Sequence, residues 1–103
     1  MRVRTRYFAM LREVTGIREE EFNVPEDLTL IDFIKYTAER YERLKKILFD
    51  ECGELRRGFA VAHNTVTVPR GEIQLRRIRD GDEVVILPPI GGGYLNDGSL
   101  TPR

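Results

Sequence analysis

The first residues of the chain alternate between apolar and charged side chains, which predicts a strand over residues 2–8. Val3, Thr5 and Tyr7 fall on one face of this strand, and arginines occupy the positions between them. A period of two is typical of a strand with one face against a core and the other in water. A weaker pattern of the same kind predicts a second strand over residues 17–24.

Between these strands, residues 9–14 are expected to form a short helical turn that ends at Gly16, because glycine suits the left-handed conformation that often closes a helix. A single long helix is expected over residues 30–49, with its apolar side chains in one stripe. Thr29 and Asp32 resemble a capping box at its start, although aspartate stands where glutamate or glutamine is usual. The apolar positions of this helix are Leu30, Phe33, Ile34, Ala38, Tyr41, Leu44 and Leu48.

In the second half of the chain, short strands are expected over residues 59–62 and 65–68. His63 and Asn64 would form the turn between them, because asparagine tolerates the positive φ of tight hairpin turns. The last strand is expected over residues 83–87, where a continuous apolar run predicts burial on both faces.

The order of these elements predicts an α+β fold with two layers, in which one long helix covers a mixed sheet of four or five strands. The first and last strands are expected to lie side by side in the middle of the sheet, since the last strand is the most apolar. At 103 residues the chain is long enough for one domain with a modest core.

Composition narrows the classes of function. Charged residues make up 33% of the chain and hydrophobic residues 41%, which is usual for a globular domain. The formal net charge is zero, so nothing indicates a protein that binds nucleic acid. No apolar run approaches the length of a membrane span and the start of the chain lacks the core of a signal peptide, so the cytoplasm is the expected compartment.

Cys52 and His63 are the residues to weigh as catalytic or metal-binding groups. Acidic neighbours disfavour the thiolate of Cys52, so an unreactive thiol is expected. No serine, cysteine or paired acid stands near His63 in the sequence, which favours a histidine of the turn over a general base. One cysteine and one histidine argue against a structural zinc site, and no constellation typical of an enzyme is visible.

The segment after the last strand carries the main functional hypothesis. It consists of Pro88, Pro89, Ile90, Gly91, Gly92 and Gly93. The prolines cannot donate backbone hydrogen bonds, so sheet pairing should stop there, and the glycines have no side chains to obstruct a narrow channel. Fully extended, this arm could reach roughly 20 Å, enough to enter the active site of a partner protein. A frayed, glycine-rich terminus is the alternative interpretation.

Three stretches of the chain carry a resemblance to a known family. They are YFAMLRE at residues 7–13, AVAHN at residues 60–64, and DGDEV at residues 80–84 leading into PPIGGG at residues 88–93. Together they resemble the small subunit of molybdopterin synthase, the MoaD-like branch of the ubiquitin-like sulfur carriers. The resemblance implies a β-grasp domain over residues 1–93, with residues 94–103 as a flexible extension.

The resemblance also implies that the chain is a sulfur carrier and not itself an enzyme. Members of the family end in two glycines with a free carboxylate, which a ubiquitin-activating-like adenylyltransferase (MoeB-like) activates with ATP. Sulfide then converts the activated carboxylate into a thiocarboxylate. The arm enters the large subunit of molybdopterin synthase (MoaE-like), where its sulfur is added to a cyclic pyranopterin to build the dithiolene that binds molybdenum or tungsten.

By the same resemblance, Gly93 would carry the sulfur on its carboxylate. Leu87, just before the prolines, and Arg12, in the LRE motif, are the candidates for docking to partner proteins. The carrier itself is expected to bind no cofactor and no metal. The rest of the arm would aim and thread the reactive end, and it comprises Pro88, Pro89, Ile90, Gly91 and Gly92.

The sequence departs from the family at residues 94–103, because a carboxylate held in the bond between Gly93 and Tyr94 cannot be adenylated. Three explanations stay open: a protease removes the extension, the extension stays and the chain is an interaction module, or the extension is foreign to the natural protein. Removal is the preferred one. A ubiquitin-like modifier joined to target lysines through Gly93 is a further alternative, because the same activated carboxylate would serve that role.

Overall fold

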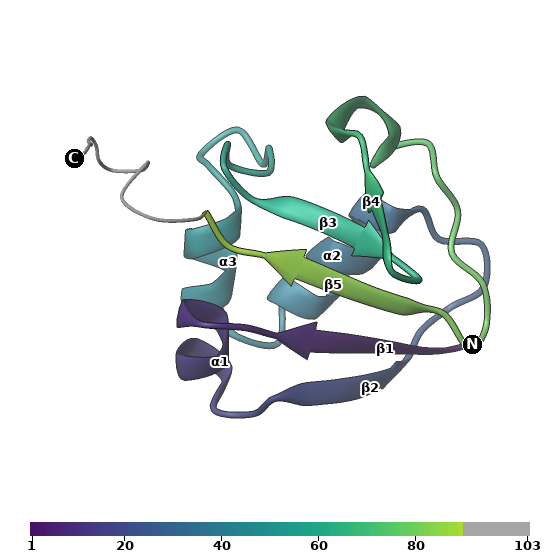
Figure 1. Cartoon of the computed structure of the whole chain (residues 1–103), viewed down its shortest axis with the longest axis horizontal. Coiled ribbons are helices and arrows are strands. Elements are labelled where there is room, and N and C mark those ends of the chain that lie inside the picture. Colours follow the sequence, from purple (N-terminus) through teal and green to yellow (C-terminus); the bar gives the residue numbers. More distant parts are fainter. Residues whose placement is uncertain (90–103) are drawn as a thin grey trace.

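The computed structural model describes residues 1–89 of the chain, which form a mixed sheet with helices packed against it (Figure 1). The strands are β1 (Arg2–Tyr7), β2 (Glu19–Asn23), β3 (Ala60–His63), β4 (Val66–Val68) and β5 (Glu83–Leu87). The helices are α1 (Met10–Thr15), α2 (Leu30–Ala38) and α3 (Glu42–Leu48), with a short 3-10 helix, η1 (Arg70–Glu72).

The five strands lie in the order β2-β1-β5-β3-β4. The first and last strands lie side by side in the interior of the sheet, as predicted. They pair in parallel, and the other pairings are antiparallel. Because β1 and β5 run in the same direction, β1 leads into α1 at the same end of the sheet at which β5 runs on to Pro88 (Figure 1).

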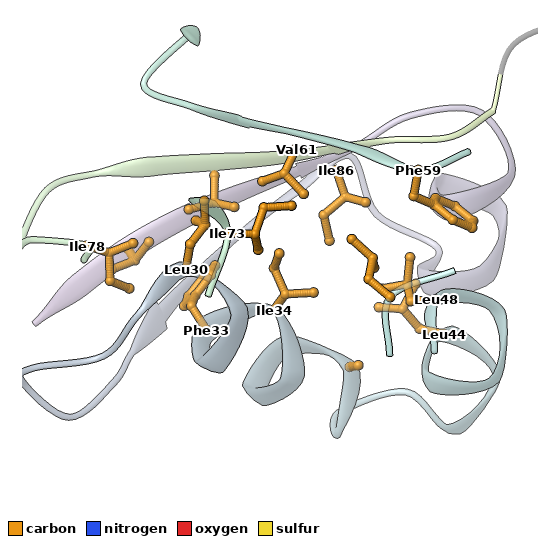
Figure 2. Close-up of a cluster of buried hydrophobic side chains, with 14 of the residues drawn as sticks. Leu30, Phe33, Ile34, Leu44, Leu48, Phe59, Val61, Ile73, Ile78 and Ile86 are labelled. Atoms are coloured by element: carbon orange, nitrogen blue, oxygen red, sulfur yellow. The ribbon is translucent and has the colours of Figure 1, made fainter. Parts of the chain in front are cut away.

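The core lies between the sheet and the helices. The predicted alternation of β1 is confirmed, with Val3, Thr5 and Tyr7 buried and the arginines between them exposed. Figure 2 shows Val61 and Ile86 pointing from the sheet toward side chains of α2 and α3. The helices thus cover one face of the sheet and leave the other face open.

The predicted burial of the last strand on both faces is wrong. Val84 and Ile86 are buried at 0% and 1% exposure, whereas Val85 and Leu87 are only half-buried. The reason is that the helices pack on a single face, so alternate residues of β5 point to the open one. Val85 and Leu87 therefore place apolar surface beside the start of the arm.

The predicted single helix over residues 30–49 is also wrong, because the chain breaks between α2 and α3. Tyr41 has an extended backbone, with φ −135° and ψ 110°. Its hydroxyl donates a hydrogen bond of 2.9 Å to Glu20, and Arg40 forms an ion pair of 3.2 Å with the same carboxylate. Tyr7 donates to Glu20 as well, at 3.1 Å, so the break lets two residues reach a carboxylate on β2.

Local signals at the ends of elements are confirmed. Thr29 and Asp32 form the expected capping box at the start of α2, with distances of 3.3 and 3.4 Å. Gly16 closes α1 in the left-handed conformation, and Asn64 has positive φ in the turn between β3 and β4.

Among residues 1–89, no helix has the length and apolar character required to cross a membrane.

Candidate functional site

The base of the arm is where the central strand ends. Leu87 is the last residue of β5 and pairs with Ala60 of β3. Pro88 and Pro89 follow outside the strand and are half-buried. As predicted, the sheet ends where the backbone loses its amide donors. Ile90, Gly91, Gly92 and Gly93 lie outside the described residues, so their expected roles stay predictions.

A glycine of the preceding connector makes room for the arm. Gly58 has φ +96°, and a Cβ placed there would lie 3.0 Å from Cγ of Pro89. That distance is too short for an alanine without movement of the proline ring or the connector. Gly58 therefore lets the connector pass against Pro89, and the sequence showed it only as the end of a polar stretch.

The opposite end of β5 is held by a dense set of hydrogen bonds around Asp82. Its carboxylate accepts from the Asn64 amide at 2.9 Å and from the Arg79 backbone amide at 2.8 Å. It also lies 2.7 Å from Nε2 of His63, whose Nδ1 accepts from Nε of Arg76 at 2.9 Å. Since Arg76 can only donate, Nδ1 has no proton, and Nε2 donates to Asp82.

These contacts change the titration of Asp82. Partial burial opposes its charge, but the hydrogen bonds from Asn64, His63 and the Arg79 amide outweigh that effect and lower the pKa of Asp82. His63 is 7% exposed, ends β3, and has both ring nitrogens occupied. The prediction that His63 lies in the turn is therefore wrong, because its side chain is buried and held by contacts within the sheet. The predicted preference for a structural histidine over a general base is supported, since both ring nitrogens already have hydrogen-bond partners.

The remaining candidates fall into two groups. Arg12 is exposed on α1 and Leu87 is half-buried on β5, and both lie at the end of the sheet from which the arm leaves (Figure 1). Cys52 is exposed in the connector, where its backbone amide donates to Asp50. Within residues 1–89, no group of histidine, cysteine and acidic side chains could hold a metal ion.

Comparison with known sequences agrees with the motifs. The profile of the ThiS family matches residues 5–93. The human molybdopterin synthase sulfur carrier subunit is 31% identical over 87 residues, which cover 84% of this chain and 89% of the relative. Small archaeal modifier protein 3 of Haloferax volcanii is 30% identical over 93 residues, which cover 90% of this chain and 100% of the relative.

Solved structures show the same architecture. The crystal structure of SAMP1 from Haloferax volcanii has a TM-score of 0.79 at 28% identity, covering 90% of this chain and 100% of that one. A structure of the BexX/CysO complex from Amycolatopsis orientalis matches with a TM-score of 0.66 at 28% identity, covering 88% of this chain and 99% of the matched chain. The chain therefore belongs to the ThiS family, and it has the β-grasp fold of the ubiquitin-like sulfur carriers, as its motifs implied.

Proposed function

We propose that the protein is the sulfur carrier of molybdopterin synthesis and that its arm delivers the sulfur. The observation that carries the proposal is that the family match runs through the arm to Gly93, while the central strand β5 leads directly into that arm. The human relative named as a molybdopterin synthase sulfur carrier subunit supports this role.

In this proposal a protease first hydrolyses the bond between Gly93 and Tyr94. A carboxylate oxygen of Gly93 then attacks the α-phosphate of ATP on a MoeB-like adenylyltransferase, and pyrophosphate leaves. Sulfide (HS⁻) attacks the carbonyl carbon of the adenylate, AMP leaves, and loss of the sulfur's proton gives the thiocarboxylate. On a MoaE-like large subunit the sulfur passes to a cyclic pyranopterin, and hydrolysis returns the carboxylate.

In this proposal the described residues take no part in the chemical steps; they determine where the arm begins and what surface surrounds its base. Pro88 and Pro89 end the sheet, Gly58 leaves room for Pro89, and Leu87 offers apolar surface at the point where the arm begins. Arg12 lies at the same end of the molecule. The groups that activate ATP and bind the pterin would come from the partner proteins.

The proposal is tested by the intact mass of the protein isolated from its native cell. We expect a chain that ends at Gly93, part of it with one oxygen replaced by sulfur. Deletion of Gly93 from this mature form should abolish sulfur transfer to the pterin and leave the melting temperature unchanged. Sulfur transfer by the deletion variant would contradict the proposal, and a full-length chain as the sole species would favour an interaction module.

A protein modifier is the second candidate, because a relative with 30% identity is a small archaeal modifier protein. Under this alternative the adenylated Gly93 would form an isopeptide bond with lysines of target proteins. Branched peptides that carry the end of the arm on lysine would be found by mass spectrometry of cell extracts. Such branched peptides, found without any thiocarboxylate, would favour the modifier function over the carrier function.

A further inference from the structure

Three arginines line one hollow at the end of the sheet from which the arm leaves. The hollow has a volume of about 200 Å³, and its walls include Tyr7 and Phe8. Arg6 comes from β1, Arg12 from α1 and Arg18 from the turn before β2. We refer to Arg6, Arg12 and Arg18 as the arginine cluster.

The pairing of β1 with β2 explains why Arg6 forms no ion pair among the described residues. Arg2 forms an ion pair of 2.7 Å with Glu21, and Arg4 one of 3.8 Å with Glu19. Each of these glutamates is directly opposite the next arginine along β1, so the ion pairs are diagonal. Continuing the diagonal from Arg6 leads to Ile17, which carries no charge, so the series of ion pairs stops before Arg6.

The cluster has an unbalanced positive charge. In the part of the chain that the structure describes, none of its guanidinium groups lies within 4.0 Å of a carboxylate. The one acidic residue that lines the hollow, Glu19, is paired with Arg4. Arg6 instead lies over the ring of Phe8, 5.6 Å from its centroid, and this ring is 37% exposed.

The location of the cluster limits what can lie against it. Tyr7 pairs with Ile86, so Phe8 and Leu87 follow at the same end of neighbouring strands. From Pro89, the chain to Gly93 can span at most about 14 Å. A protein that holds the end of the arm in its active site must therefore come close to this end of the sheet.

We propose that the arginine cluster docks an acidic segment of the enzyme that adenylates the arm. Guanidinium groups bind carboxylates through paired hydrogen bonds, and arginine and aromatic side chains are enriched in the buried parts of interfaces. The exposed face of Phe8 and the half-buried Leu87 supply the apolar contact beside these charges. This inference rests on the proposed activation of Gly93, and it adds the charge and location of the surface that the enzyme must recognise.

The test uses the chain that ends at Gly93 with the activating enzyme of the same organism, and measures pyrophosphate exchange. The variant replaces all three arginines of the cluster with glutamate. We expect the KM of the activating enzyme for this variant to rise at least about tenfold at low salt, with kcat unchanged. The reason is that charge pairs across an interface act mainly on encounter and affinity. The KM of the wild type should rise with salt, and that of the variant should depend on salt much less.

A matched control reverses the same number of charges elsewhere. Lys35, Arg43 and Lys46 are exposed on α2 and α3, away from the open face of the sheet. Their replacement by glutamate should leave KM within about twofold of the wild type, because distant sites act independently. Should the cluster variant fail to fold, Arg18→Glu alone, outside every helix and strand, is expected to raise KM in the same direction.

The outcomes separate the docking surface from the function. A cluster variant with the KM and salt dependence of the wild type would overturn the docking proposal and leave the carrier role intact. A loss confined to kcat would also overturn it, since docking acts on binding. A wild-type chain ending at Gly93 that the enzyme does not adenylate would overturn both the docking and the proposed sulfur chemistry.

Discussion

The two ends of the central strand β5 are built in opposite ways. At its start, Asp82 joins His63, Asn64 and the backbone of Arg79 through hydrogen bonds of 2.7–2.9 Å. At its finish, the strand gives way to two prolines, and the same end of the sheet carries the arginine cluster, whose guanidinium groups have no carboxylate partner within residues 1–89. One end satisfies its polar groups internally, and the other leaves them available to another protein.

This contrast suggests a division between stability and function along one strand. Internal hydrogen bonds to a partly buried carboxylate stabilise the fold, because breaking them leaves donors without acceptors. Groups left unpaired at a surface add little to stability but are available for binding. Substitutions at the two ends should therefore separate these two properties, and the predictions below are ordered by the size of the expected effect.

The largest effect on stability is expected from Asp82→Ala. It removes the acceptor for His63, Asn64 and the Arg79 amide at once, and we expect a loss of about 3 kcal/mol in the free energy of unfolding. Urea denaturation measures this loss. Asp80→Ala is the control, because Asp80 accepts a single exposed hydrogen bond, from the backbone of Arg2 at 2.6 Å, and should cost less.

The folded fraction of the Asp82 variant should keep the KM of the wild type for adenylation, since the change lies at the opposite end of β5 from the arm. A raised KM in this variant, with native circular dichroism, would show that the two ends of the strand are coupled. That result would break the proposed division between them.

A smaller effect is expected from Gly58→Ala at the base of the arm. The new methyl group would meet the ring of Pro89 at 3.0 Å, and φ at this position is +96°. We expect a loss of about 2 kcal/mol, part from the backbone and part from the clash. Adenylation should also weaken, because Pro89 must shift and the arm leaves at a different angle.

Gly53→Ala is the matched control for that substitution. Gly53 has a similar φ of +82° in the same connector, but nothing lies within 4 Å of the added methyl group. This variant should lose only the free energy of unfolding that a positive φ costs an alanine, about 1 kcal/mol, and its adenylation should be unaffected. Equal effects of the two substitutions on both properties would show that the contact of Gly58 with Pro89 has no role in aiming the arm.

The smallest expected effect is the loss, at acid pH, of the stability that the Asp82 carboxylate contributes. The pKa of Asp82 is lowered in the folded protein because the hydrogen bonds it accepts outweigh its partial burial. The unfolded chain therefore takes up this proton at a higher pH than the folded chain does. Its contribution to stability is complete above about pH 4 and is lost as the pH falls toward the folded pKa.

Urea denaturation of the wild type and of Asp82→Asn between pH 7 and pH 3 measures that contribution. Other carboxylates titrate in both proteins. The difference in unfolding free energy between the wild type and the variant therefore reports on Asp82 alone. We expect the difference in unfolding free energy to shrink as the pH falls. A difference that stays constant with pH would mean that the charge of Asp82 has no part in holding this end of the strand.

Much of the sheet was predictable because its signals are local. Alternation defines β1, and the continuous apolar run defines β5, within a residue of the observed bounds. Gly16 and Asn64 were identified because few residues accept positive φ. The two layers were predicted from the order of the elements, but the apolar run of β5 does not show which of its faces is covered. Its burial on one face had to come from the structure.

The break between α2 and α3 could not be predicted from spacing. Ala38, Tyr41 and Leu44 follow one another at intervals that suit an unbroken helix. At the break, Arg40 and Tyr41 contact the carboxylate of Glu20 on β2, in the other layer. A contact between residues this far apart in the sequence does not change the spacing of apolar positions, so the spacing cannot reveal it.

The base of the arm shows the same limit. Its motif identified the prolines and glycines, but the proximity of Gly58 to Pro89 depends on how the connector folds back. From the sequence, Arg6 is only one of the polar residues on one face of a strand. The ion pairs of β1 with β2 show that, within residues 1–89, Glu19 pairs with Arg4 and Arg6 forms no ion pair. Surface sites assembled from several segments need the tertiary structure to be recognised.

The position of β5 has a consequence for synthesis on the ribosome. This strand is made after the other four strands of the sheet, yet it joins the pair β1 and β2 to the pair β3 and β4. Until residues 83–87 emerge, the two halves share no strand pairing and the sheet cannot close. A chain that stops early would therefore lack the folded domain as well as the arm, so that only completed molecules would reach the activating enzyme.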